Sequence, residues 1–177
     1  HGKRHPFYMT YRTGATKDGL LTAQEIELIA DCGAYASTSG PVLSNAVSFA
    51  TGPYVVPHVK IDGYVVYTNN PMTMAFRGFG ANQPCFAYEL QMEKLAQALG
   101  IDPVEVRLKN VLVSGSIGPL GNVIPGGAGL KETLEKAACA AGWRRVGQHW
   151  IAPNLPSASA PYKRRGIGVA CGWKNIG

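Results

Sequence analysis

Two phenylalanines, one arginine and two glycines stand together in the run Ala75-Phe76-Arg77-Gly78-Phe79-Gly80. Glycine permits backbone dihedrals that other residues avoid and lets a ligand approach the main chain closely. The arginine offers a fork of donors that suits an anionic or oxo group, and the phenylalanines offer flat apolar walls. The run lies between a strand-like and a helix-like region, where free N–H groups at the helix start also favour anions. These residues are the first candidates for binding chemistry.

The elements that must position this run can be predicted from hydrophobic periodicity and turn residues. Residues 5–13 and 20–30 alternate on either side of the turn residues 17–19, which predicts a β-hairpin. Further elements are a strand-like region at 55–68, a last strand at 163–173, and helices at 39–50, 83–99, 102–110 and 130–141. Because strands and helices mix without strict alternation, the sequence predicts an α+β (mixed α/β) fold, with a β-hairpin and a mixed sheet packed with helices.

A glycine- and proline-rich stretch divides the chain. Residues 114–129 contain six glycines and two prolines, which predicts a long loop. The sequence therefore predicts a first part, residues 1–113, that carries the Phe-Arg-Gly run. A second part, residues 130–177, holds a helix and the terminal strand, with a linker at 154–161 between them.

The composition bounds the class of protein. With 177 residues, 46% of them hydrophobic, the chain can bury a core, and no apolar run reaches the length of a membrane span. The net charge is +6, and eight of the 17 basic residues lie from Lys131 onward. That charge fits a surface for an acidic partner or nucleic acid, or a face that is solvated or covered by the rest of the protein. We favour the covered or solvated face, because no nucleic-acid motif accompanies the charge.

The titratable residues suggest neither a metal site nor a catalytic pair. The four cysteines are widely spaced, without a Cys-x-x-Cys pair, which argues against zinc or an iron–sulfur cluster and favours free thiols in a reducing cytoplasm. His5 lies between Arg4 and Pro6 and is expected to be structural. Glu89 and Glu93 are spaced i,i+4 on one face of the helix, and we expect that face to be solvated. The apolar residues of the same helix are Phe86, Leu90, Leu95 and Leu99.

Residues 75–80 resemble the AFRGFG signature of the molybdenum hydroxylases, the xanthine dehydrogenase and aldehyde oxidase group. Further blocks resemble the same large subunit, in the family's order and at its spacing. They are Arg4-His5-Pro6-Phe7, Lys17-Asp18-Gly19, Ala30-Asp31-Cys32-Gly33-Ala34-Tyr35, Ile101-Asp102-Pro103 and Arg107-Leu108-Lys109-Asn110. The resemblance covers residues 1–110, and more loosely the remainder, and implies part of a molybdopterin-binding domain of mixed α/β structure.

The resemblance implies roles for individual residues. Ala75, Phe76, Arg77 and Gly78 would form the cofactor-side loop, with backbone N–H groups facing an oxo or dithiolene group. Phe79 would be the aromatic wall that orients a flat heteroaromatic or aldehyde substrate. Asn45 falls where purine-oxidising members carry a substrate-binding arginine, which lowers the expectation of a purine. The alternative for Asn45 is an ordinary surface position on a helix.

The resemblance also implies what this chain lacks. The family's catalytic glutamate, in a Gly-Glu-Pro-like context, and its glycine-rich pterin-binding run are absent from the sequence, so no catalytic residue and no metal ligand is assigned here. We expect a piece of a larger cytoplasmic enzyme that hydroxylates an aldehyde or N-heterocycle with water-derived oxygen and is inactive alone.

The expected cofactor is molybdenum–molybdopterin, in the simple or the cytosine dinucleotide form. Iron–sulfur clusters and flavin would lie on other domains or subunits. The expected partners are those subunits, the rest of the large subunit and a small-molecule substrate, with neither nucleic acid nor membrane. The rival hypothesis is a non-catalytic scaffold or assembly module that keeps the molybdopterin-binding fold.

Overall fold

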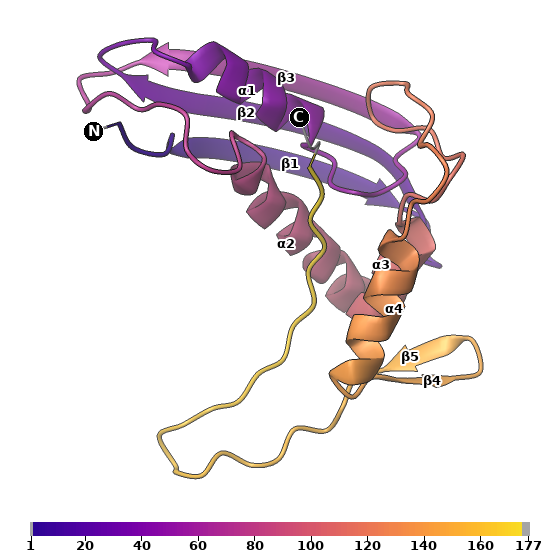
Figure 1. Cartoon of the computed structure of the whole chain (residues 1–177). Coiled ribbons are helices and arrows are strands. Elements are labelled where there is room, and N and C mark those ends of the chain that lie inside the picture. Colours follow the sequence, from indigo (N-terminus) through magenta and orange to yellow (C-terminus); the bar gives the residue numbers. More distant parts are fainter. Residues whose placement is uncertain (1, 175–177) are drawn as a thin grey trace.

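The computed structural model describes residues 2–174 and shows a mixed sheet with helices packed against it (Figure 1). In chain order the elements are β1 (Phe7–Ala15), β2 (Leu21–Gly33), α1 (Ser39–Ser48), β3 (His58–Tyr67), α2 (Asn82–Leu99), α3 (Pro103–Asn110), α4 (Leu130–Ala140), β4 (Arg144–Val146) and β5 (His149–Ile151). The predicted α+β class is confirmed. In the described part of the chain, no helix is long and apolar enough to cross a membrane.

The main sheet has the strand order β1-β2-β3. β1 and β2 pair antiparallel, with Tyr11 opposite Ile26, and form the predicted hairpin. Its turn is closed by the Thr16 N–H, which donates to the Leu20 carbonyl at 2.8 Å. β2 and β3 pair parallel, so a crossover must connect them, and α1 lies in that crossover.

One face of this sheet forms the core beneath α1 and α2 (Figure 1). Ile26, Leu28 and Ala30 of β2 are fully buried there and pack with Leu43, Ala46 and Ala50 of α1. Glu25 and Glu27, which alternate with these residues on β2, point to the other face and are exposed. This period-two alternation is the pattern of a sheet covered on one side only.

The end of the molecule away from the main sheet differs from the prediction. α4 and α3 pack with the short β4–β5 hairpin around Val104, Ala138, Trp143 and Trp150, and the sequence analysis did not foresee this hairpin. The predicted strand at residues 163–173 is wrong, because that segment is irregular. Among residues 2–174 no strand lies beside it to pair its backbone groups, and most of it is exposed to water.

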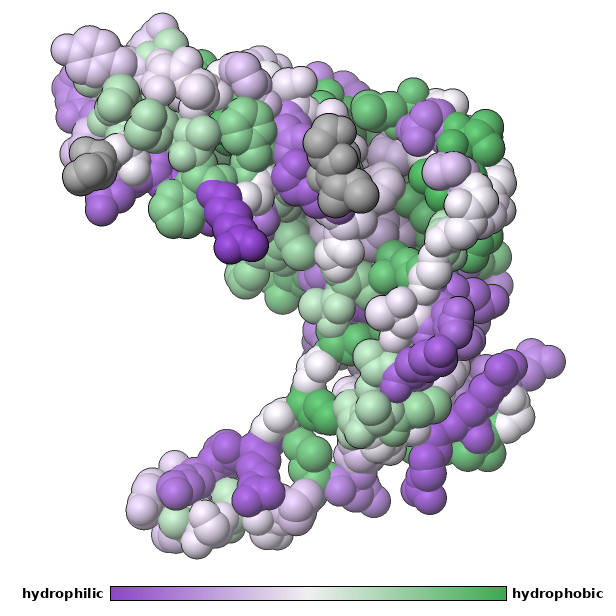
Figure 2. Space-filling model, viewed as in Figure 1, coloured by the Kyte–Doolittle hydropathy of each residue, from purple (hydrophilic) through white to green (hydrophobic). Residues whose placement is uncertain are grey.

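Residues 152–170 form an arm that leaves the hairpin and returns to the core at Cys171 (Figure 1). Figure 2 shows this arm standing clear of the body, with hydrophilic side chains gathered at its tip. The exposed arm residues Lys163, Arg164 and Arg165 and the β4 residues Arg144 and Arg145 carry much of the positive charge of the second half.

Candidate functional site

The Phe-Arg-Gly run lies in the segment that connects β3 to the start of α2. The N–H of Thr73 donates to the Cys32 carbonyl at 3.2 Å, and the N–H of Met74 donates to the Lys3 carbonyl at 2.9 Å. The N–H of Ala75 then donates to the Thr38 side-chain oxygen at 2.7 Å. The segment is thus fixed by its backbone up to Ala75, directly before the loop.

Asp31 and His5 form hydrogen bonds that hold the neighbourhood of this segment in place. The Asp31 carboxylate accepts hydrogen bonds from the Thr68 hydroxyl, the Gly33 N–H and the Asn70 amide. These bonds, led by Thr68, hold the pKa of Asp31 below its usual value. His5 is buried, and its Nε2 lies 2.7 Å from the Ser39 hydroxyl at the start of α1. Burial lowers the pKa of His5 despite the nearby Asp31 charge, and these contacts fit the structural role expected of it.

The loop itself, residues 76–80, is a tight turn. The Phe79 N–H donates to the Phe76 carbonyl at 2.7 Å, and the Ala81 N–H donates to the Gly78 carbonyl at 3.0 Å. Gly78, Phe79 and Gly80 have φ angles of 97°, 46° and 92°. A positive φ is uncommon for a bulky residue such as Phe79 and costs about 1–3 kcal/mol, so it persists where the surroundings enforce it.

Gly80 shows how closely the loop packs on α1. A Cβ placed on Gly80 would lie 2.1 Å from the carbonyl oxygen of Val42. No side chain fits there, so the loop backbone rests directly on the α1 backbone.

Two side chains from distant elements hold loop carbonyls. The Asn45 amide, on α1, donates to the Phe79 carbonyl at 2.6 Å. The Arg4 guanidinium donates through Nη2 to the Arg77 carbonyl at 2.8 Å, and its central carbon lies 4.5 Å from the centre of the Phe76 ring. The Asn82 amide reaches the same Arg77 carbonyl at 3.3 Å.

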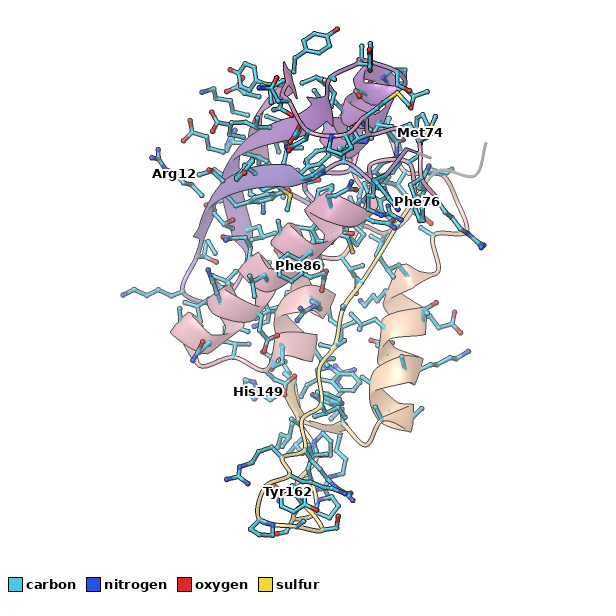
Figure 3. The ribbon with its side chains drawn as sticks, turned by 90° about the vertical axis from the view of Figure 1, so that its left-hand side faces the viewer. Arg12, Met74, Phe76, Phe86, His149 and Tyr162 are labelled. Carbon is cyan, nitrogen blue, oxygen red and sulfur yellow. The ribbon has the colours of Figure 1, made fainter. Side chains whose placement is uncertain are left out.

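The predicted site residues are therefore brought together. Ala75, Phe76, Arg77 and Gly78 are consecutive at the surface, and Asn45 contacts Phe79 from α1. The Phe76 side chain is 54% exposed, and Figure 3 shows it at the edge of the molecule beside the start of α2. Arg77 is exposed as well, and Phe79 is half-buried beneath them.

The loop presents a set of free donors. The backbone N–H groups of Phe76, Arg77, Gly78 and Gly80 donate no hydrogen bond to any other residue within 2–174. With the exposed Arg77 guanidinium, they form a donor set without a carboxylate, which suits an anionic oxygen or sulfur ligand. Within the same residues, no group of three or more His, Cys, Asp or Glu side chains is placed to hold a metal ion.

A second polar cluster, not predicted from the sequence, lies in the core. Glu89 was expected on a solvated face but is only 8% exposed. Its carboxylate accepts a bond from the Tyr54 hydroxyl at 2.5 Å and one from Arg107 Nε at 2.9 Å. Arg107 is 1% exposed and also donates to the carbonyls of Pro103 and Glu89.

The charges in this cluster stabilise one another. Burial alone would lower the pKa of Arg107, but the adjacent Glu89 raises it. Burial and the nearby charges of Cys171 and Glu89 raise the pKa of Tyr54, so its hydroxyl stays a donor. Glu93 does lie at the surface, with one oxygen 3.6 Å from Arg107.

One sequence pattern could have revealed Glu89. It falls in a stripe along α2 with the buried residues Tyr88, Met92 and Ala96, whereas Phe86 and Leu90 of the expected apolar face are exposed. A carboxylate inside a buried stripe needs a buried cation, and Arg107 supplies it from α3.

Comparison with known proteins supports a relationship over most of the chain. Residues 1–111 match the family model described as a molybdopterin cofactor-binding domain. The large molybdopterin subunit of nicotinate dehydrogenase from Eubacterium barkeri is 50% identical over 135 residues, which are 76% of this chain and 32% of that protein. A putative xanthine dehydrogenase molybdenum-binding subunit from Escherichia coli is 36% identical over 170 residues, 95% of this chain and 22% of that protein.

Solved structures show the same fold. The aldehyde oxidoreductase of Desulfovibrio desulfuricans has a TM-score of 0.75 and 31% identity, over 78% of this chain and 15% of that one. The aldehyde oxidoreductase of Desulfovibrio gigas has a TM-score of 0.72 and 34% identity, over 79% and 16%. The chain thus spans about a third or less of the length of each of these relatives.

Proposed function

We propose, because this chain belongs to the family of molybdopterin cofactor-binding domains, that it forms the cofactor-side part of a molybdenum hydroxylase active site. The relatives are molybdopterin oxidoreductases of the xanthine dehydrogenase and aldehyde oxidoreductase type. The observation that carries the proposal is the loop at residues 76–80. Its N–H groups other than that of Phe79, and the Arg77 side chain, meet no acceptor among residues 2–174, while Arg4 and Asn45 hold the carbonyls of Arg77 and Phe79.

The residues of the loop fit a molybdenum–pterin group. The N–H groups of Phe76, Arg77, Gly78 and Gly80 would donate to its oxo or dithiolene atoms, and Ala75 fixes the approach of the chain to the loop. When bound, this group supplies the oxidation chemistry, while the protein supplies position and electrostatics. We assign either the simple molybdopterin or its cytosine dinucleotide form, with iron–sulfur clusters and flavin on other domains or subunits.

The substrate would be an aldehyde or an N-heterocycle. Phe79 is half-buried and would stack on a flat substrate, which adds about 0.5–1.5 kcal/mol beyond area burial. Asn45 offers no cation for a purine, and its amide is occupied by the Phe79 carbonyl at 2.6 Å. The relative at 50% identity is named for nicotinate, an N-heterocycle, which supports that class of substrate.

The rest of the site would come from other parts of the enzyme. Because this chain lacks the expected glutamate base, we propose that it is inactive alone and works with the remainder of the large subunit and with electron-transfer subunits, in the cytoplasm. A scaffold without catalysis would not need a phenylalanine held at a positive φ beside an exposed arginine, so we rank the scaffold hypothesis second.

Metal analysis tests this function. The protein that carries this chain is purified from its host together with whatever binds it, and its molybdenum and pterin are measured per chain. We expect about one molybdenum per chain in the parent, at least a tenfold loss in Arg77→Met, and no loss in the surface variant Arg12→Met. A parent protein without molybdenum or pterin would overturn the proposal and favour the scaffold.

A further inference from the structure

We propose that Arg4 is a positioning residue that aims the N–H of Gly78 at the ligand of the loop, an inference that rests on the proposed function. Arg4 lies 73 positions from Arg77 in the sequence, yet its Nη2 donates to the Arg77 carbonyl at 2.8 Å. Its guanidinium also covers the Phe76 ring, at 4.5 Å. The Arg4 side chain therefore contacts two consecutive loop residues, the backbone of Arg77 and the ring of Phe76.

Because of the geometry of the peptide bond, the hydrogen bond from Arg4 to the Arg77 carbonyl also fixes the direction of the Gly78 N–H. The Arg77 carbonyl and the Gly78 N–H belong to one planar trans peptide and point in opposite directions. Because Arg4 and Asn82 hold the carbonyl on one side, the Gly78 N–H is directed to the other side, where it meets no acceptor among residues 2–174.

The same pattern, in which a side chain holds the carbonyl of a peptide while its N–H has no acceptor within 2–174, recurs two peptides further along the loop. The peptide between Gly78 and Phe79 is satisfied inside the turn, through Phe76 and Ala81. The peptide after Phe79 repeats the first: Asn45 holds its carbonyl at 2.6 Å, and the Gly80 N–H meets no acceptor in the described part of the chain. Alternate N–H groups, those of Gly78 and Gly80, are thus presented by side chains that reach the loop from outside.

Arginine is suited to this role in a way that lysine is not. The planar guanidinium stacks on an aromatic ring while its edge donates in a fixed direction. A lysine ammonium would keep the charge, but it would lose the stack on Phe76 and the fixed orientation.

The test uses the whole protein that carries this chain, with the variants Arg4→Met and Arg4→Lys and the control Arg12→Met. Arg12 lies on β1, far from the loop in the sequence; its side chain is 79% exposed and forms an ion pair with Glu25. Two quantities are measured: the pterin retained per chain after gel filtration, and deuterium uptake of the peptide that covers residues 72–82. We expect at least tenfold less pterin and faster uptake in both Arg4 variants, with thermal unfolding within the range of Arg12→Met.

The outcomes separate this inference from the proposed function. Full pterin retention and unchanged uptake in Arg4→Met would overturn the role of Arg4, and parent behaviour of Arg4→Lys would show that charge alone suffices, which also overturns it. If the parent protein holds no pterin, the proposed function fails, and the deuterium uptake of residues 72–82 still decides whether Arg4 orders the loop.

Discussion

Two arginines of this chain occupy opposite environments. Arg107 is 1% exposed, and its guanidinium is bonded to a carboxylate and two backbone carbonyls. Arg77 is exposed in a strained loop, and its side chain makes no hydrogen bond or ion pair to another residue within 2–174. The first arrangement holds α2 against α3, and the second leaves donors for a ligand.

The two environments differ in which of their polar groups have a hydrogen-bond or ion-pair partner. In the core cluster every charge has a partner, because an unpaired buried charge is strongly destabilising. In the loop the carbonyls are bonded by Arg4, Asn45 and Asn82, but several N–H groups are not. Structural stability and the proposed ligand binding therefore depend on different residues, and mutations should separate them.

The largest effect is expected from Arg107→Met. It leaves the Glu89 carboxylate buried without its cation, and removing one partner of such a pair costs about 3–5 kcal/mol. The free energy of unfolding is measured by urea titration of the purified protein. The matched surface variant Arg12→Met should change it by about 0.5 kcal/mol or less. Equal losses in the two variants would mean that the cluster adds nothing to stability.

Gly80→Ala tests how closely the loop backbone packs on α1. The new Cβ would lie 2.1 Å from the Val42 carbonyl oxygen at a φ of 92°, and we expect a loss of about 2–3 kcal/mol in unfolding free energy. Gly100→Ala is the control, since Gly100 has a φ of 66° but no atom within 4 Å of its Cβ position. It should cost about 1–2 kcal/mol, the strain alone, and a Gly80→Ala loss no larger than that would contradict close packing on α1.

The sequence predicted the fold where a local period was present. The β1–β2 hairpin and the four helices follow from alternation, turn residues and helix-stop residues, and each lies close to its expected range. The β4–β5 hairpin has only three residues in each strand, too few for a period to show. Residues 163–173 read as a strand, but the strand would have needed a neighbour that the fold does not provide.

From the sequence, the candidate site could be proposed only within its own segment. The types and spacing of residues 75–80 indicate ligand binding, so this loop could be identified as a candidate without a structure. Arg4 could not, because its bond to Arg77 crosses 73 positions. The stripe along α2 marks Glu89 as buried, but it does not show which residues pair with it, because Tyr54 and Arg107 lie outside that helix. Contacts of this kind depend on tertiary packing, which the spacing within one helix does not encode.

A third prediction concerns high pH and the core cluster. Burial raises the pKa of Cys171 to about 11 from an ordinary value near 9, so the folded state keeps a proton that the unfolded state releases. The unfolding free energy should therefore fall as pH rises from about 9 to 11, by at most about 1.4 kcal/mol per pH unit for one such group. Urea titrations at pH 8 to 11 measure this fall.

Two cysteine variants assign the effect. Cys171→Ala should make the fall less steep, while Cys139→Ala, which changes an exposed thiol, should leave it unchanged. Parallel pH curves for the parent and Cys171→Ala would show that the buried thiol has no part in the fall. The tyrosines Tyr11, Tyr54 and Tyr88, whose pKa values burial also raises, would then be the groups responsible.

The smallest expected change in stability is that of Arg77→Met. Arg77 is exposed and pairs with no residue in the described part of the chain, so its removal should alter the unfolding free energy by about 0.5 kcal/mol or less, as in Arg12→Met. Urea titration is done on the cofactor-free form, so that ligand binding does not contribute to the measured stability. A loss above about 1.5 kcal/mol, a size that surface substitutions seldom reach, would place Arg77 with Arg107 as a structural residue, and the separation of holding and binding arginines would fail.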